Sequence, residues 1–288
     1  MDQAVIPALR GKLMKIRIAH SPDADDAFMF YGLASGKVPS NGFDITHVLK
    51  DIETLNREAL KGTYEVTAVS IHAYAYLAEK YLLLGSGASM GEDYGPMIIA
   101  REPFPLSELK GKKIAVPGTM TTAFLALKLL EPSFEHTVVP FDKIIDHVSS
   151  GKSDAGLIIH EGQIFYPQRG LKLIVDLGKW WKKETGLPLP LGGNGIRRDL
   201  GEETIQKLAK LIRESIAYGL AHREEALAHA LSYARGLDKN DADRFVSMYV
   251  NQRTLDYGED GKRAVKLLLE KACRAKLIPS LPPLEFVD

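Results

Sequence analysis

The sequence predicts an α/β protein with two lobes, each built on a mostly parallel sheet flanked by helices. Short apolar segments alternate with segments of helical periodicity through the first two-thirds of the chain, which indicates right-handed βαβ crossovers. Two Gly- or Pro-rich stretches, at 85–90 and 185–195, interrupt this alternation. They favour one discontinuous lobe, residues 1–99 and 195–288, and one continuous lobe, residues 100–194.

Hydrophobic periodicity predicts the individual elements in order. In the first series we expect strands at 15–19, 43–49 and 66–70 and helices at 26–35, 53–61 and 73–81. In the second series we expect strands at 97–100, 113–116, 137–139, 155–160 and 171–176, and helices at 121–130 and 141–149. From residue 202 the periodicity is helical almost to the end. Such a clamp would bind a ligand between its lobes and close around it by hinge motion.

Composition excludes several classes of function. Lys plus Arg and Asp plus Glu both number 37, so the net charge is zero and neither nucleic acid nor a membrane surface is favoured as a partner. Cys273 is the only cysteine, which excludes an intramolecular disulfide and a cysteine zinc cluster and favours a reducing compartment. Residues 1–14 lack the apolar core of a secretory signal. We therefore expect a cytoplasmic protein, with residues 1–13 interpreted as a loose extension or a start-site artefact.

The segment 155–161, Ala-Gly-Leu-Ile-Ile-His-Glu, indicates the chemistry most directly. An aliphatic run of this length is typical of a buried strand, and ligands of open α/β sheets bind beyond the carboxyl ends of such strands. His160 and Glu161 occupy that end, where a general base would face a cleft. The alternative is a core histidine hydrogen-bonded to a backbone carbonyl. Adjacent strand residues point to opposite faces, so Glu161 is a secondary candidate for activating the base.

Three strand-to-helix junctions, at 19–26, 68–72 and 116–123, combine small or hydroxyl residues with the start of a helix. Helix N-termini offer N–H groups and a positive dipole end to a carboxylate or phosphate, and the Thr121-Thr122 junction suits an anion best. Ordinary N-capping is the alternative at any one junction.

Two further sequence features are considered as metal or nucleotide sites, and neither indicates one. The aspartates of the first junction, at positions 23, 25 and 26, are interpreted as helix-start residues rather than as metal ligands. Gly192-Gly193-Asn194-Gly195 is interpreted as a hinge, because it lacks the strand-then-helix setting of a nucleotide loop. We expect neither a cofactor nor a metal.

Three blocks of sequence resemble the 1,4-dihydroxy-6-naphthoate synthase family of the futalosine pathway of menaquinone biosynthesis. They are Asp-Ile-Glu-Thr-Leu-Asn at 51–56, Gly-Leu-Ile-Ile-His-Glu at 156–161, and a block from Val-Asp-Leu-Gly at 175 through Trp-Trp at 180 to Thr-Gly-Leu-Pro-Leu-Pro-Leu-Gly at 185–192. The likeness extends from Met14 to about Leu200. It implies a periplasmic-binding-protein-like fold of type II with two lobes. It also implies a carbon–carbon lyase that cuts the sugar-derived portion from cyclic de-hypoxanthine futalosine.

The resemblance assigns roles to individual residues. The histidine of the second block, His160, is implied to be the base. Family substrate contacts match Ala68, Val69, Ser70, Thr121 and Thr122. To these we add Ser21 and Asp26 of the first junction, and Glu161, as predicted substrate-binding residues. The expected partner is a small-molecule carboxylate, with no nucleic acid and no membrane. The oligomeric state is left open, with a homodimer among the options.

Two departures from the family leave the substrate open. The family pattern Ser-Pro-Cys-Pro-Asn-Asp-Thr-Phe stands here as Ser-Pro-Asp-Ala-Asp-Asp-Ala-Phe at 21–28, and a family lysine stands here as Ala68. Both changes make the cleft less favourable to an anion. The alternatives are therefore a non-catalytic binding protein for an aromatic acid, or a related lyase such as a chorismate dehydratase.

Overall fold

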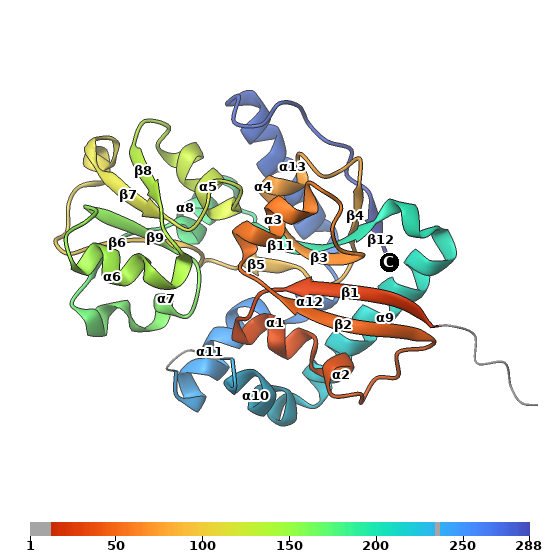
Figure 1. The fold of residues 1–288 in the computed structure, drawn as a ribbon. Helices are drawn as coiled ribbons and strands as arrows, with labels where there is room; N and C mark the ends of the chain where they lie inside the picture. The colour runs from red at the N-terminus through yellow and green to blue at the C-terminus, as the bar shows by residue number, and fades with distance from the viewer. Residues whose placement is uncertain (1–12, 234–236) are drawn as a thin grey trace, which may run out of the picture.

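Two sheets lie side by side, each covered by helices (Figure 1). The structure is a computed structural model and describes residues 13–233 and 237–288. The extension predicted for residues 1–13 lies, apart from Leu13, outside this part. We call each sheet, together with the helices packed on it, a lobe.

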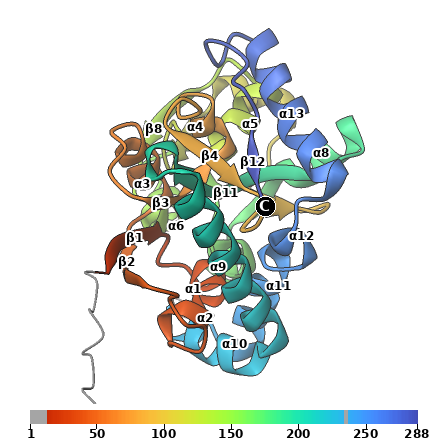
Figure 2. The ribbon, with the colours of Figure 1, turned by 90° about the vertical axis from the view of Figure 1, so that its right-hand side faces the viewer.

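The larger lobe has seven strands in the order β12-β4-β11-β3-β1-β2, with β5 also paired to β11. Its strands are β1 (Met14–His20), β2 (Phe43–Leu49), β3 (Val66–Ser70), β4 (Tyr81–Leu84), β5 (Ser89–Gly91), β11 (Leu189–Arg197) and β12 (Phe286–Val287). Its N-terminal helices are α1 (Ala24–Met29), α2 (Tyr31–Ala34), α3 (Ile52–Ala59) and α4 (Ile71–Tyr74). Its C-terminal helices are α9 (Glu202–Ala221), α10 (Arg223–Leu231), α11 (Lys239–Tyr249), α12 (Gln252–Leu255) and α13 (Gly258–Arg274). In Figure 2, α9 runs across the front of this lobe.

The smaller lobe has five strands in the order β10-β6-β9-β7-β8. They are β6 (Met97–Ala100), β7 (Lys113–Val116), β8 (Glu135–Val138), β9 (Ala155–Ile158) and β10 (Lys172–Asp176). Its helices are α5 (Thr122–Leu130), α6 (Ile144–Ser149), α7 (Gly162–Phe165) and α8 (Leu177–Thr185). The largest hydrophobic core joins both lobes, because Val69 and Leu83 of the larger sheet belong to the same buried cluster as Ile98 and Leu157 of the smaller one.

The α/β architecture with two sheets is confirmed, with local corrections. Each sheet is mixed rather than mostly parallel, because β6 and β11, the strands next to the crossings between lobes, run antiparallel to their neighbours. The helix predicted at 73–81 is wrong beyond Tyr74, since Tyr81 is fully buried and begins β4. The predicted lobe boundaries stay a prediction. By sheet membership, we propose crossings at 92–96 and 186–188.

The hinge interpretation of Gly192-Gly193-Asn194-Gly195 is wrong, because these residues lie inside β11 and pair with β3. Glycine is needed there for close packing. A Cβ on Gly193 would lie 2.0 Å from the hydroxyl oxygen of Tyr257, a contact that real side chains do not make.

Within the described part of the chain, no helix combines the length and apolar character needed to cross a bilayer.

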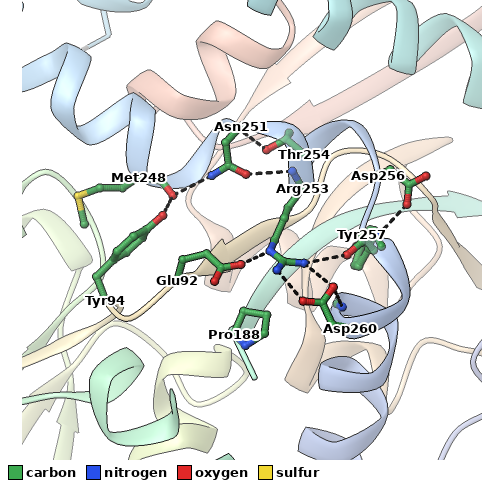
Figure 3. A network of polar contacts seen from close by, with 12 residues as sticks. Glu92, Tyr94, Pro188, Met248, Asn251, Arg253, Thr254, Asp256, Tyr257 and Asp260 are labelled. Atoms are coloured by element: carbon green, nitrogen blue, oxygen red, sulfur yellow. Dashed lines mark hydrogen bonds and ion pairs between the residues drawn. The ribbon is translucent and has the colours of Figure 1, made fainter. Parts of the chain in front are cut away.

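A polar network fixes the first crossing to the C-terminal helices (Figure 3). Arg253 of α12 bonds to Glu92 in the crossing and donates from Nη1 and Nη2 to both carboxylate oxygens of Asp260, at 2.8 and 2.7 Å. The hydroxyl of Tyr94 donates to the carbonyl of Met248. The hydrogen bonds from Arg253 lower the pKa of Asp260 to about 2.

Replacing Arg253 by Met should destabilise the protein, because two carboxylates lose their shared partner. The pair is partly exposed, so we expect a loss of about 1–2 kcal/mol in the free energy of unfolding, measured with urea at pH 7. The contribution of Asp260 is present above its ordinary pKa of 3.8 and is lost as the pH falls toward 2, so the difference should shrink in acid. Lys207→Met, which breaks an exposed ion pair with Glu203, is the control and should change little. Equal stability of Arg253→Met and wild type would contradict this role.

His20, at the end of β1, is buried against the partly buried His47 of β2. His20 donates from Nδ1 to the carbonyl of Ser21, and its Nε2 lies 3.1 Å from Nδ1 of His47. The His20 ring also stacks on Phe30 at 4.5 Å. Burial, followed by the proximity of His47, lowers the pKa of His20 to about 3. The native state therefore keeps His20 neutral where the unfolded chain would bind a proton.

Acid should destabilise the protein through His20. The free energy of unfolding is unaffected by this group above pH 6.5 and falls as the pH drops from 6.5 toward 3, by up to about 1.4 kcal/mol per pH unit. Urea unfolding across this range should show a shallower decline for His20→Gln, which does not titrate. Parallel pH profiles of the variant and wild type would rule out this contribution.

Candidate functional site

A cavity lies between the two lobes, with an empty volume of about 780 Å³ including its mouth. Its wall is formed by Ser21, Asp23, Asp25, Asp26, Met29, Ile52, Ala68, Val69, Ser70, Gly87, Ser89, Pro96, Thr121, Thr122, Ala123, Ile159, Leu191, Gly192, Gly193, Asn194 and Tyr249.

The cavity brings together residues that are far apart in the sequence. Every predicted substrate-binding residue except Glu161 lies on its wall, and they come from all three predicted junctions. Of the segment 159–161, only Ile159 is on the wall. The binding roles themselves remain predictions.

The N-terminus of α5 opens onto this cavity. The hydroxyl of Thr121 accepts the N–H of Phe124 at 3.2 Å and donates to the carbonyl of Gly118 at 3.0 Å. The hydroxyl of Thr122 accepts the N–H of His72 at 3.1 Å and donates to the carbonyl of Leu191 at 2.5 Å. Each hydroxyl proton already has an acceptor. An anion here would instead be bound by backbone N–H groups of the first turn and by the positive end of the helix dipole.

Ser70, at the carboxyl end of β3, is held in place by Asn56. The Asn56 amide donates to the Ser70 hydroxyl at 2.9 Å and accepts the Ser70 N–H at 2.8 Å. Among the described residues, no acceptor for the Ser70 hydroxyl proton is found, so this proton can be donated to a ligand. Sequence reasoning gave Asn56 no role, because its complete burial and its contact with Ser70 are seen only in the structure.

The start of α1 places three carboxyl groups on the wall. Asp26 accepts the N–H of Ser21 at 2.6 Å, and the Ser21 hydroxyl donates to Asp23 at 2.5 Å. Burial raises the pKa of Asp26 to about 7, and burial followed by the neighbouring carboxylates raises the pKa of Asp25 well above its usual value. The site therefore carries less negative charge near pH 7 than three aspartates suggest. Among the described residues, no cluster of His, Cys, Asp and Glu suits a metal ion.

His160 lies two residues beyond β9, which ends at Ile158 rather than at the predicted residue 160. Its Nε2 donates to the carbonyl of Phe141 at 2.8 Å, and its Nδ1 accepts the N–H of Gly162 at 2.9 Å. The side chain is buried. In this arrangement His160 has the bonding expected of the core-histidine alternative.

Contacts across the cavity join the two lobes. Glu53 of α3 accepts the N–H of Met120, next to α5, at 2.9 Å. Glu161, next to α7, accepts the N–H of Ala24 at the start of α1, at 3.5 Å. The hydroxyl of Tyr249 donates to the Gln163 amide oxygen at 2.7 Å. Each lobe thus has a buried glutamate whose carboxylate accepts a backbone N–H of the other lobe.

His20 and His72, which fall within the first and second predicted junctions, do not line the cavity. His20 is buried against the partly buried His47, and Nδ1 of His72 lies 3.2 Å from the carbonyl of Thr121. Sequence reasoning missed Tyr249 and Asn194, which do line it and come from distant segments.

Comparisons with known proteins agree with this geometry. A family described as menaquinone biosynthesis matches residues 16–274. The chain is 44% identical to a 1,4-dihydroxy-6-naphthoate synthase of Thermus thermophilus, over 93% of this chain and 98% of the relative. It is 36% identical to a protein of the same name from Streptomyces coelicolor, over 93% and 96%.

Solved structures support the fold. A crystal structure of a protein from Archaeoglobus fulgidus has a TM-score of 0.88 and 51% identity, covering 92% of this chain and 98% of that one. A Candida albicans protein described as having the generic periplasmic-binding-protein fold has a TM-score of 0.67 at 13% identity, covering 96% and 99%. The periplasmic-binding-protein-like fold is thereby confirmed. The chain belongs to the menaquinone-biosynthesis family and, by its relatives, to the family of the 1,4-dihydroxy-6-naphthoate synthases.

Proposed function

We propose that this protein is a cytoplasmic, cofactor-independent lyase that converts cyclic de-hypoxanthine futalosine to 1,4-dihydroxy-6-naphthoate. The observation that carries the proposal is the cavity between the lobes, in which residues from all three predicted junctions meet. The names of the two relatives support the product, and the resemblance described above supports the substrate.

The substrate carboxylate would bind at the N-terminus of α5. The donors there are the N–H groups of Thr122 and Ala123 and the hydroxyl proton of Ser70, all on the cavity wall. The aromatic rings would pack on the apolar part of the wall, which includes Met29, Ile52, Val69, Ile159 and Leu191. An apolar wall with a few convergent donors is typical of sites for small aromatic acids.

His160 is our proposed base. An imidazole with an ordinary pKa of about 6.5 can take a carbon-bound or hydroxyl proton near neutral pH. To do so, the His160 ring must turn away from the Phe141 carbonyl or the Gly162 N–H, because both its nitrogens are hydrogen-bonded. Its position directly after Ile159 of the cavity wall supports this role. Asp26 is the alternative proton acceptor, since it lies on the wall with its pKa raised to about 7.

Substitution of His160 by Asn should abolish turnover while leaving binding intact. We expect naphthoate release to fall by roughly 10²–10⁴-fold, as for loss of a general base, while calorimetry shows substrate affinity within about threefold of wild type. Asp26→Asn is the matched comparison and should keep most of the activity. Activity retained in His160→Asn but lost in Asp26→Asn would transfer the role of base to Asp26. Saturable binding by wild type without any release would favour the binding-protein alternative.

Removal of the Ser70 hydroxyl should weaken binding of both the substrate and the naphthoate product. We expect about a tenfold loss of affinity for each, because both carry the same carboxylate and lose one charge-assisted hydrogen bond. Ser35→Ala is the control, since the Ser35 hydroxyl donates to the Tyr31 carbonyl and Ser35 is not on the wall. Unchanged affinities in Ser70→Ala would argue against carboxylate binding at this end.

A further inference from the structure

The amide of Asn194 is a buried donor that the site described so far does not use. Asn194 is 1% exposed, and its Nδ2 has no hydrogen-bond partner among the described residues. The residue lies on the cavity wall. Buried N–H groups are nearly always paired in folded proteins, so an unpaired one facing a cavity points to a ligand atom as its partner.

The surrounding backbone leaves room for this amide. Gly87 has a φ of +87°, and a Cβ built on it would lie 2.0 Å from Asn194 Nδ2. On β11, Gly192 lies two residues before Asn194, on the same face of the strand, and has no side chain that could cover the amide. The chain thus places a polar side chain in the middle of a central strand and keeps its neighbours small.

Asn194 lies away from the N-terminus of α5, and strand β11 gives the separation between them. The carbonyl of Leu191 accepts the Thr122 hydroxyl, so Leu191 marks the α5 end of β11. Asn194 follows three residues later, which corresponds to about 10 Å along a strand. The register agrees, since Gly192 pairs with Ser70 whereas Asn194 pairs with Ala68. The cavity therefore has two separate groups of donors along β11.

Electrostatics distinguishes the two regions of the wall. The N-terminus of α5 attracts a negative group, whereas the neutral amide of Asn194 offers an N–H donor to an uncharged oxygen. A ligand with a carboxylate at one end and hydroxyl groups at the other would bind in one orientation only.

We propose that Asn194 donates to an oxygen of the sugar-derived portion of the substrate, while the carboxylate lies against α5. This inference rests on the proposed function and adds the orientation of the substrate to it. Asn194 is then a residue that distinguishes the substrate from the naphthoate product, which lacks the sugar-derived portion.

The test measures the affinities of three variants for two ligands. Affinities for cyclic de-hypoxanthine futalosine are measured in a His160→Asn background, and affinities for 1,4-dihydroxy-6-naphthoate in the same proteins. Asn194→Ala and Asn194→Leu should weaken substrate binding by about tenfold and change product binding by less than about twofold. Ser70→Ala should weaken the binding of both the substrate and the product. It is therefore the matched control for the carboxylate end of the ligand.

Thermal unfolding separates a binding role from a structural one. Because Asn194 Nδ2 has no hydrogen-bond partner among the described residues, Asn194→Leu should unfold at the same temperature as its parent or at a higher one. Equal loss of affinity for both ligands, or a lower unfolding temperature with substrate affinity unchanged, would overturn the proposed orientation. A wild-type protein that neither binds nor converts the substrate would instead contradict the proposed function.

Discussion

The reciprocal contacts of two buried glutamates hold the lobes around the cavity. Glu53 extends from the larger lobe to the N–H of Met120, and Glu161 extends from the smaller lobe to the N–H of Ala24. Both N–H groups lie near the start of a helix, where the dipole favours a carboxylate. The positions of the α1 and α5 starts relative to each other therefore depend on these contacts, and so does the shape of the site.

Much of the fold could be predicted because its signals are local. Alternating strand and helix patterns located β1, β2, β3, β6 and β7 to within about two residues, since each is an apolar run bounded by polar residues. Strand β11 could not be predicted in this way. Its glycines look like a loop, and it becomes a strand only by pairing with β3, β4 and β5, which come from residues about a hundred positions earlier.

The site was predictable where it lies at strand ends and not elsewhere. Ser70, Thr121, Thr122 and Asp26 follow or begin regular elements, and the topology of α/β sheets brings such positions to one edge. Asn56 and Asn194 have no local motif, because an amide acquires its role from neighbours that are distant in sequence. The bonding of the His160 ring also depends on such a neighbour, the Phe141 carbonyl.

A crystal structure of the His160→Asn variant with cyclic de-hypoxanthine futalosine would test the account most directly. The account predicts the carboxylate against the Thr122 and Ala123 N–H groups and the Ser70 hydroxyl, with the sugar-derived portion beside Asn194. A ligand bound in the reverse orientation, or outside the cavity between the lobes, would contradict it.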